Sequence, residues 1–189
     1  MSFLDKIEQL DHDLLLWINQ HNTPFLDDVM WGISSKWFGV PFYLLVAFLL
    51  FKKYGLKNTL IALAVVGASI GLSDLISTEL FKNVIQRYRP THHLELKDQL
   101  HIVNNYRGGM YGFVSSHAAN MMAFAVASLL FLRTKWLSVL LIFFALIVAY
   151  SRVYLGVHYP LDVFCGADLG ATIGLLFYYF SNKYYFSKQ

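Results

Sequence analysis

Charged residues are scarce in this 189-residue sequence. Asp, Glu, Lys and Arg account for 14% of it, hydrophobic residues for 57% and aromatic residues for 17%. A soluble globular domain carries about 25% charged residues, so the composition predicts a protein embedded in lipid. The formal net charge of +3 is too small to indicate a nucleic-acid partner.

Cysteine is nearly absent as well. Cys165 is the only one and lies in an apolar segment, which excludes a disulfide within the chain. We expect no secretory signal peptide, because acidic residues interrupt the N-terminal segment where its apolar stretch would lie. These residues are Asp5, Glu8, Asp11 and Asp13. The length suits a single domain over residues 1–189.

The first 30 residues predict an amphipathic helix that lies on the membrane surface. Apolar residues recur there at helical spacing, and Thr23-Pro24 should end the helix. Five apolar segments follow, and crossing a bilayer takes about 20 residues. The predicted fold class is therefore all-α, an integral membrane helical bundle of about five transmembrane helices over residues 31–189. The segments are Trp37–Phe51, Thr59–Phe81, Phe113–Leu132, Trp136–Tyr154 and Leu161–Phe180.

Basic residues in three connections predict which side of the membrane each loop faces. Lys52, Lys53 and Lys57, then Arg133–Lys135, then Lys183 and Lys188 should be cytoplasmic by the positive-inside rule. The loops 82–112 and 151–160 then lie outside. The small size and the lack of an organelle-targeting signal favour a bacterial inner membrane, with these loops facing the periplasm.

Glycines recur at four-residue spacing in two of the apolar segments. Gly67 and Gly71 form one pair, and Gly166, Gly170 and Gly174 form a longer stripe. Such stripes let helix backbones approach closely in lipid, so we interpret both as packing surfaces.

Three polar patches must lie on one membrane face. They are 82–90, which ends in Arg89-Pro90, then 113–117, which ends in Ser115-Ser116-His117, and 151–162. No predicted span separates the first patch from the second, and two spans separate the second from the third. The even number of crossings places all three patches together, whichever face that is.

The shared patches contain a potential phosphate site. Lys82, Arg89 and Arg152 are cations without acids close in sequence, and gathering them near lipid is costly unless an anion neutralises them. Arginine suits phosphate oxygens geometrically. Ser115 and Ser116 stand where a helix should begin, and free N–H groups at such a position attract anions.

Two histidines add the chemistry of phosphoryl transfer. His158 and Asp162 are four residues apart near the start of the fifth helix, so the carboxylate can hold one ring nitrogen and leave the other free to attack phosphorus. His117 can protonate the departing lipid oxygen and then activate water.

The spacing Lys-x6-Arg-Pro, Ser-x-His and Ser-Arg-x5-His-x3-Asp resembles the type 2 phosphatidic acid phosphatase superfamily. The resemblance implies metal-independent hydrolysis without a cofactor, acting on a lipid phosphate in the bilayer. It implies His158 as nucleophile, Asp162 as its partner and His117 as acid. It also implies phosphate ligands at Lys82, Arg89, Ser115, Ser116 and Arg152. Val114 and Ser116 depart from the proline and glycine usual in the middle motif.

Several other polar residues have two interpretations. Arg87 either touches phosphate or faces water, and Glu79 could pair with Lys82. His92 and His93 point opposite ways in an extended loop, so we predict no metal site. Asp74 and Asp168 lie within spans, where acids are functional candidates, although a packing role is favoured. The loop 91–112 could cover the site, with Gly108-Gly109 as its hinge.

Two other functions share these motifs. A vanadium haloperoxidase uses the same residues, but such enzymes are soluble. A non-enzymatic lipid-phosphate binder or transporter would use the basic residues alone. For a phosphatase, the candidate substrates are undecaprenyl diphosphate, phosphatidylglycerophosphate, phosphatidate and lipid A phosphates. The compact chain favours the first two.

Overall fold

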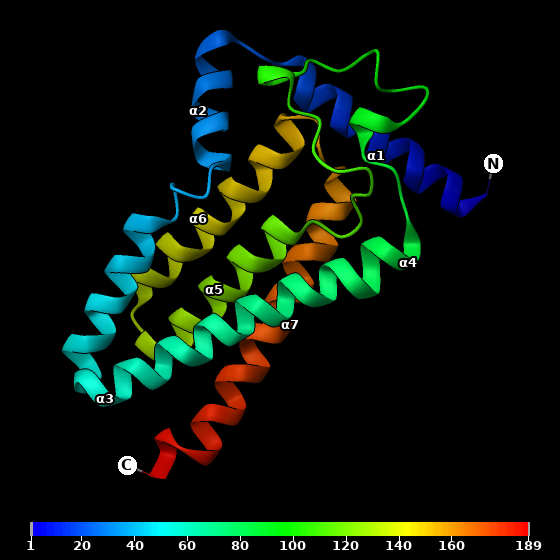
Figure 1. Cartoon of the computed structure of the whole chain (residues 1–189). Coiled ribbons are helices and arrows are strands. Elements are labelled where there is room, and N and C mark those ends of the chain that lie inside the picture. The colour runs from blue at the N-terminus through cyan, green and yellow to red at the C-terminus, as the bar shows by residue number, and fades with distance from the viewer. Residues whose placement is uncertain (1, 189) are drawn as a thin grey trace.

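The computed structural model describes residues 2–188, and all its regular elements are helical (Figure 1). Helix α1 (Phe3–Gln20) begins at Ser2, whose side chain and that of Asp5 cap each other's backbone. Helix α2 (Pro24–Ser34) begins at Thr23, with proline in its first turn. The break predicted at Thr23-Pro24 is therefore confirmed, and a second short helix follows it.

Helix α3 (Val40–Leu75) contains two arms that diverge from a sharp bend at Gly55 (Figure 1). Gly55 has φ 70° and ψ 176°, a conformation that glycine adopts without a side-chain clash. The second arm continues through a π-helical segment (Ile76–Lys82) into α4 (Asn83–Ile85). The sequence predicted a loop over residues 51–58, but a single non-helical residue makes this turn.

Three further helices complete the bundle. They are α5 (Ser116–Leu132), α6 (Lys135–Tyr154) and α7 (Pro160–Tyr184). Short 3-10 turns occupy Pro90–His92, Val103–Asn105 and Phe186–Lys188. By length and composition, Val40–Ile85, Lys135–Tyr154 and Pro160–Tyr184 are long and apolar enough to cross a membrane, and α5 is a shorter apolar helix. The all-helical membrane fold is confirmed, while the number of five crossings stays a prediction.

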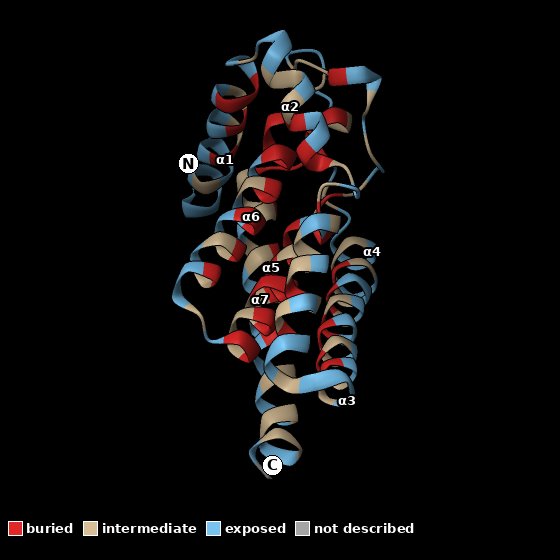
Figure 2. Ribbon diagram, turned by 90° about the vertical axis from the view of Figure 1, so that its left-hand side faces the viewer, coloured by how far each residue is buried: buried red, intermediate tan, exposed pale blue. Residues whose placement is uncertain are grey.

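Helix α5 lies at the centre, and buried residues concentrate around it (Figure 2). The stripe on α7 packs directly against it, because a Cβ at Gly170 would lie 2.0 Å from the Ala119 carbonyl oxygen. Gly166 and Gly174 similarly face the backbone of Ser115 and Ala123. This confirms the packing interpretation for α7. The packing interpretation is wrong for Gly67 and Gly71 within the described chain, since a Cβ at either position would meet nothing within 4 Å.

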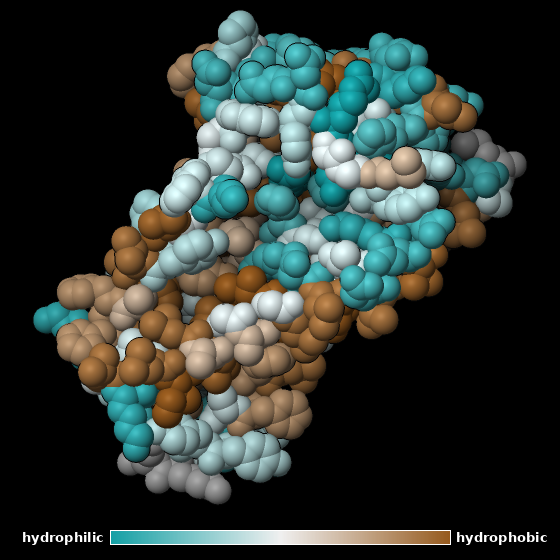
Figure 3. Space-filling model, in the orientation of Figure 1, coloured by the Kyte–Doolittle hydropathy of each residue, from teal (hydrophilic) through white to brown (hydrophobic). Residues whose placement is uncertain are grey.

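On the face shown in Figure 3, the surface over the bundle is mostly apolar, and the end that carries α1, α2 and the long loop is mostly polar. At the opposite end, Lys53 Nζ donates to the carbonyls of Phe131 and Leu132, and Arg133 donates to Tyr178. Lys53 thereby neutralises the negative end of the α5 dipole. These contacts place the basic connections at one end of the bundle.

Helix α1 buries two polar residues beside Leu15 and Ile18 and leaves several large apolar residues exposed. Asp11 and Asn19 are buried, whereas Leu4, Leu14 and Trp17 are exposed. The Asn19 amide joins two distant segments, donating to the carbonyls of Tyr154 and His101. The apolar outer face suits the predicted position on a membrane surface.

Candidate active site

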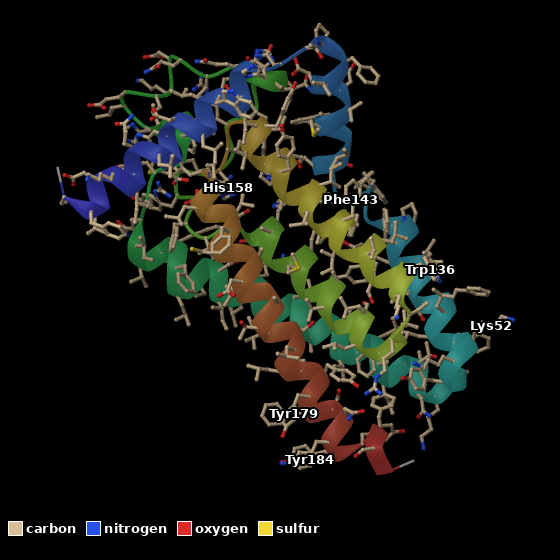
Figure 4. All side chains as sticks on the ribbon, turned by 180° about the vertical axis from the view of Figure 1, so that it is seen from behind. Lys52, Trp136, Phe143, His158, Tyr179 and Tyr184 are labelled. Atoms are coloured by element: carbon tan, nitrogen blue, oxygen red, sulfur yellow. The ribbon has the colours of Figure 1, made fainter. Side chains whose placement is uncertain are left out.

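The three polar patches of the sequence converge at one end of the bundle. Figure 4 shows His158 beneath α1, at the end of the molecule away from Lys52 and Tyr184. The charges of Lys82, Arg89 and Arg152 act electrostatically on both His117 and His158. The expected common face is therefore present.

A cavity of about 460 Å³ opens between α2, α3, α5 and α6. Its wall changes from cationic to apolar, with Tyr43, Met121 and Phe144 on the apolar side. Five of the eight predicted site residues line it, namely Lys82, Arg89, Ser116, His117 and Arg152. The other three are almost fully buried, namely Ser115, His158 and Asp162.

Lys82 reaches the start of α5 because the π-helical segment carries it there. Its Nζ donates to Ser116 Oγ, which also shares a 2.6 Å hydrogen bond with Ser77 Oγ. Single π-helical turns of this kind occur mostly at functional sites. Ser116, one of the two departures from the resembled motif, thus holds the lysine in place through its side chain.

Arg89, in the loop before α5, and Arg152, in the last turn of α6, bring positive charge to the cavity. Arg152 is 3% exposed and donates to the hydroxyls of Ser34 and Tyr106. Arg89 Nε donates to the Tyr111 carbonyl. Arg89 Nη1 and Arg152 Nε are buried and have no partner within residues 2–188. Burial and the nearby charge of Arg152 both lower the pKa of Arg89, which means that both disfavour its charged form. A bound anion would offset the desolvation of Arg89 and its repulsion by Arg152.

His158 and Asp162 form the predicted pair. His158 Nδ1 lies 3.4 Å from Asp162 Oδ2, which also accepts from the Tyr159 backbone N–H. A backbone hydrogen bond links His158 to Gly112, where a Cβ would lie 3.1 Å from Asp162. Burial, together with Arg89 and Arg152, holds the pKa of His158 well below its usual range. The imidazole is therefore neutral, as a nucleophile requires.

Arg87 and Asp11 contact the candidate site in a way that sequence reasoning did not predict. The guanidinium of Arg87 donates to Asp162 Oδ1 at 2.7 Å and to Asp11 Oδ2 at 2.8 Å. It also lies over the ring of Tyr159. Burial alone would lower the pKa of Arg87. The carboxylates of Asp162 and Asp11 have the larger combined effect, so the pKa of Arg87 is raised. From the sequence we expected Arg87 either to touch phosphate or to face water, and neither alternative predicted these two ion pairs.

The remaining candidates lie in varied surroundings. Ser115 accepts from the Ala118 N–H as the N-cap of α5, and its own N–H donates to the Asp162 carbonyl. Glu79 accepts from Asn83 instead of pairing with Lys82. Asp168 and Asp74 are both exposed, and Asp74 lines the cavity and accepts from Asn120. Residues 2–188 hold no group of three or more His, Cys, Asp or Glu placed to bind a metal.

The loop over the site is held to the segment before it. Gly112 N donates to the Arg87 carbonyl and Arg89 N donates to the Met110 carbonyl. The Thr91 hydroxyl donates to the Arg107 carbonyl at 2.6 Å. The end of the loop lies against His158, since a Cβ at Gly112 would lie 3.5 Å from His158 Nδ1. The role of the loop as a mobile lid stays a prediction.

Comparison with known proteins agrees with this geometry. The model of the PAP2 superfamily matches residues 59–186. The chain belongs to the PAP2 superfamily. This confirms the resemblance drawn from the three motifs. With its apolar helices and its relatives, this PAP2 protein is an integral membrane enzyme and a phosphatase.

Relatives match over most of the chain. The lipid A 4'-phosphatase of Bacteroides thetaiotaomicron is 33% identical over 95% of this chain and 80% of its own. The lipid A 4'-phosphatase of Porphyromonas gingivalis is 33% identical over 93% of this chain and 74% of its own. The undecaprenyl-diphosphatase of Sulfolobus acidocaldarius is 47% identical over 35% of this chain and 32% of its own.

Solved structures share the PAP2 fold. The transmembrane PAP2-type phosphatidylglycerolphosphate phosphatase of Bacillus subtilis has a TM-score of 0.73 at 24% identity, covering 95% of this chain and 88% of that one. LpxE of Aquifex aeolicus has a TM-score of 0.64 at 23% identity, and the match covers 87% of this chain and 92% of that one.

Proposed function

We propose that this PAP2 protein removes phosphate from the head group of a membrane lipid through a phosphohistidine intermediate on His158. The observation that carries the proposal is the convergence of Lys82, Arg89 and Arg152 on one cavity beside His117. None of the three cations forms an ion pair with a carboxylate within residues 2–188. A phosphate group supplies the missing negative charge.

The reaction has two steps in this scheme. The His158 nitrogen that does not face Asp162 attacks phosphorus, a P–N bond forms and the bond to the lipid oxygen breaks. His117 gives its proton to that oxygen. Water then attacks phosphorus as His117 takes its proton, the P–N bond breaks, and inorganic phosphate leaves. The three cations stabilise the equatorial oxygens in both steps.

Asp162 keeps the imidazole of His158 oriented for attack. The carboxylate accepts from Nδ1–H, which fixes the tautomer and stabilises the positive charge that develops on the ring. The scheme uses no metal, and the positive charge of the site comes from protein side chains.

The substrate we favour is a phosphorylated lipid A-type glycolipid. The lipid A 4'-phosphatases are similar to this chain over more than nine-tenths of its length, whereas the undecaprenyl-diphosphatase matches about a third of it. This preference replaces the one drawn from chain length. We further propose that the site faces the periplasm of a bacterial inner membrane, because the basic connections gather at the other end.

Phosphate release from a panel of purified lipid phosphates, in detergent with EDTA, tests this function. Wild type, His158→Ala and the control His21→Ala are compared, since His21 is an exposed residue at the end of α1. The proposal expects release by wild type and the control, and none by His158→Ala. Release that His158→Ala retains in full would favour another nucleophile. Binding without hydrolysis in wild type would favour a lipid-phosphate binder, and peroxide-dependent halide oxidation with vanadate would favour a haloperoxidase.

A further inference from the structure

A second polar cluster lies in the cavity beside the phosphate ligands. Asn120 Nδ2 donates to Asp74 Oδ1 at 3.0 Å, and both residues line the cavity with Thr78. Asp74, Thr78 and Lys82 are spaced four residues apart along one chain segment, while His117 and Asn120 are three apart on α5. The two rows continue the cavity wall away from the phosphate ligands.

The cluster has hydrogen-bond acceptors and lacks donors to fill them. A carboxylate only accepts, so its contact with Asn120 fixes the amide with Nδ2 toward Asp74. Asn120 Oδ1 is then an acceptor, and it is buried without a partner within residues 2–188. Asp74 Oδ2 has no partner among these residues either. Asp74 is an exposed residue, so the cost falls on Asn120 Oδ1. An acceptor buried without a partner is costly unless a ligand donates to it.

The position of the cluster indicates which part of the substrate would contact Asp74 and Asn120. In the proposed reaction His117 protonates the oxygen that joins phosphate to lipid. Asn120 lies about 5 Å farther along α5, which is the distance of a few covalent bonds from that oxygen. The atoms that meet Asp74 and Asn120 therefore belong to the leaving alcohol, directly next to the phosphate ester.

We propose that Asp74 and Asn120 form a subsite for a sugar ring that bears the phosphate. A sugar offers adjacent hydroxyl or amide N–H donors close to the ester oxygen, which suits two neighbouring acceptors. A polyprenyl phosphate has only hydrocarbon there, a polyprenyl diphosphate has a second phosphate whose oxygens only accept, and phosphatidate has acylated oxygens. A site built to accept hydrogen bonds discriminates against ligands without donors. This inference rests on the proposed function and specifies its substrate class.

The test measures kcat/KM on two substrates with the full-length protein in detergent. One substrate is an acylated glucosamine disaccharide phosphate, and the other is a polyprenyl phosphate. Asp74→Asn keeps the size of the side chain and turns one acceptor into a donor. Asn120→Leu removes the amide, and Asp168→Asn is the matched control, because Asp168 is an exposed acid on α7 outside the cavity.

We expect wild type to prefer the glycolipid. Asp74→Asn and Asn120→Leu should each lower the glycolipid-to-polyprenyl ratio of kcat/KM by about tenfold or more. Asp168→Asn should keep the wild-type ratio. A ratio unchanged in both cavity variants, or a wild type that prefers the polyprenyl phosphate, would overturn the subsite.

Failure of the proposed function would have a different signature. If wild type releases phosphate from no lipid, hydrolysis is refuted, and binding then decides the subsite. The His158→Ala protein leaves the glycolipid intact, so its Kd can be compared with that of His158→Ala combined with Asp74→Asn. A Kd raised about tenfold or more in the double variant supports the subsite, and an equal Kd refutes it.

Discussion

Arg87 and Asp162 form a partly buried ion pair, with Arg87 Nη1 2.7 Å from Asp162 Oδ1. The other guanidinium nitrogen of Arg87 binds Asp11 on α1, and Asp11 also accepts from the Leu161 N–H. The carboxylate that orients His158 is therefore held from outside by the N-terminal helix. The amphipathic helix is part of the structure that supports the active site.

Asp11→Asn should lower kcat by about tenfold while KM stays within about twofold. Arg87 would lose one of its two carboxylates and would hold Asp162 less firmly, and misplacement of a catalytic group acts mainly on the chemical step. Steady-state kinetics on a lipid phosphate measure both constants. Asp13→Asn is the control, because Asp13 is exposed on the same helix. Equal losses in the two variants would show that α1 contributes only general stability.

Ser116→Gly should weaken phosphate binding. The change restores the residue usual in the family but removes the hydroxyl that accepts from Lys82 and contacts Ser77. Losing one charge-assisted hydrogen bond costs about 1.5–3 kcal/mol, so inhibition by inorganic phosphate should weaken roughly tenfold or more. Ser138→Ala, which removes a hydroxyl bonded only within α6, controls for loss of a serine. Unchanged inhibition in Ser116→Gly would mean that Lys82 keeps its position without the serine.

Gly170→Ala should destabilise the protein. The added Cβ would lie 2.0 Å from the Ala119 carbonyl oxygen, so α5 and α7 would have to move apart at a cost of about 1–3 kcal/mol. Thermal unfolding in detergent measures the loss as a lower Tm. Gly67→Ala is the matched control, since a Cβ at Gly67 meets nothing within 4 Å. A Tm of Gly170→Ala equal to that of the control would refute the close contact.

His158 should remain uncharged as the pH falls through about 6.5, the ordinary pKa of histidine. The lowered pKa means that protonation requires a pH below that value, so the nucleophile stays available in mild acid. Nuclear magnetic resonance of histidine labelled with ¹⁵N, with His158→Ala to assign the signal, follows the titration in the free enzyme. A midpoint at or above about 6.5 would contradict the burial of this imidazole.

Sequence patterns predicted which candidate residues come together better than they predicted the residues that support them. The even number of spans between patches was enough to bring Lys82, His117 and His158 to one end, because membrane crossings restrict topology. Asp11 was missed because an acid on an amphipathic surface helix normally faces water. Its partner Arg87 lies far along the chain, and no local pattern indicates the contact.

The turn at Gly55 shows a second limit of sequence reasoning. Lysines and tyrosine around it suggested an eight-residue loop, but one glycine with positive φ reverses the helix while its neighbours stay helical. The glycines at four-residue spacing show the same limit. Spacing identifies a face suited to close packing, and only the fold decides that Gly170 meets α5 while Gly67 faces outward.

The central claim is a covalent bond between phosphorus and His158, and trapping that bond tests it most directly. A lipid carrying ³²P in its phosphate is mixed with the enzyme, the reaction is quenched in alkali, which preserves a phosphorus–nitrogen bond, and labelled peptides are identified by mass spectrometry. We predict label on His158 in wild type and none in His158→Ala. Rapid phosphate release by wild type with no labelled protein, or with label on a residue other than His158, would contradict the account.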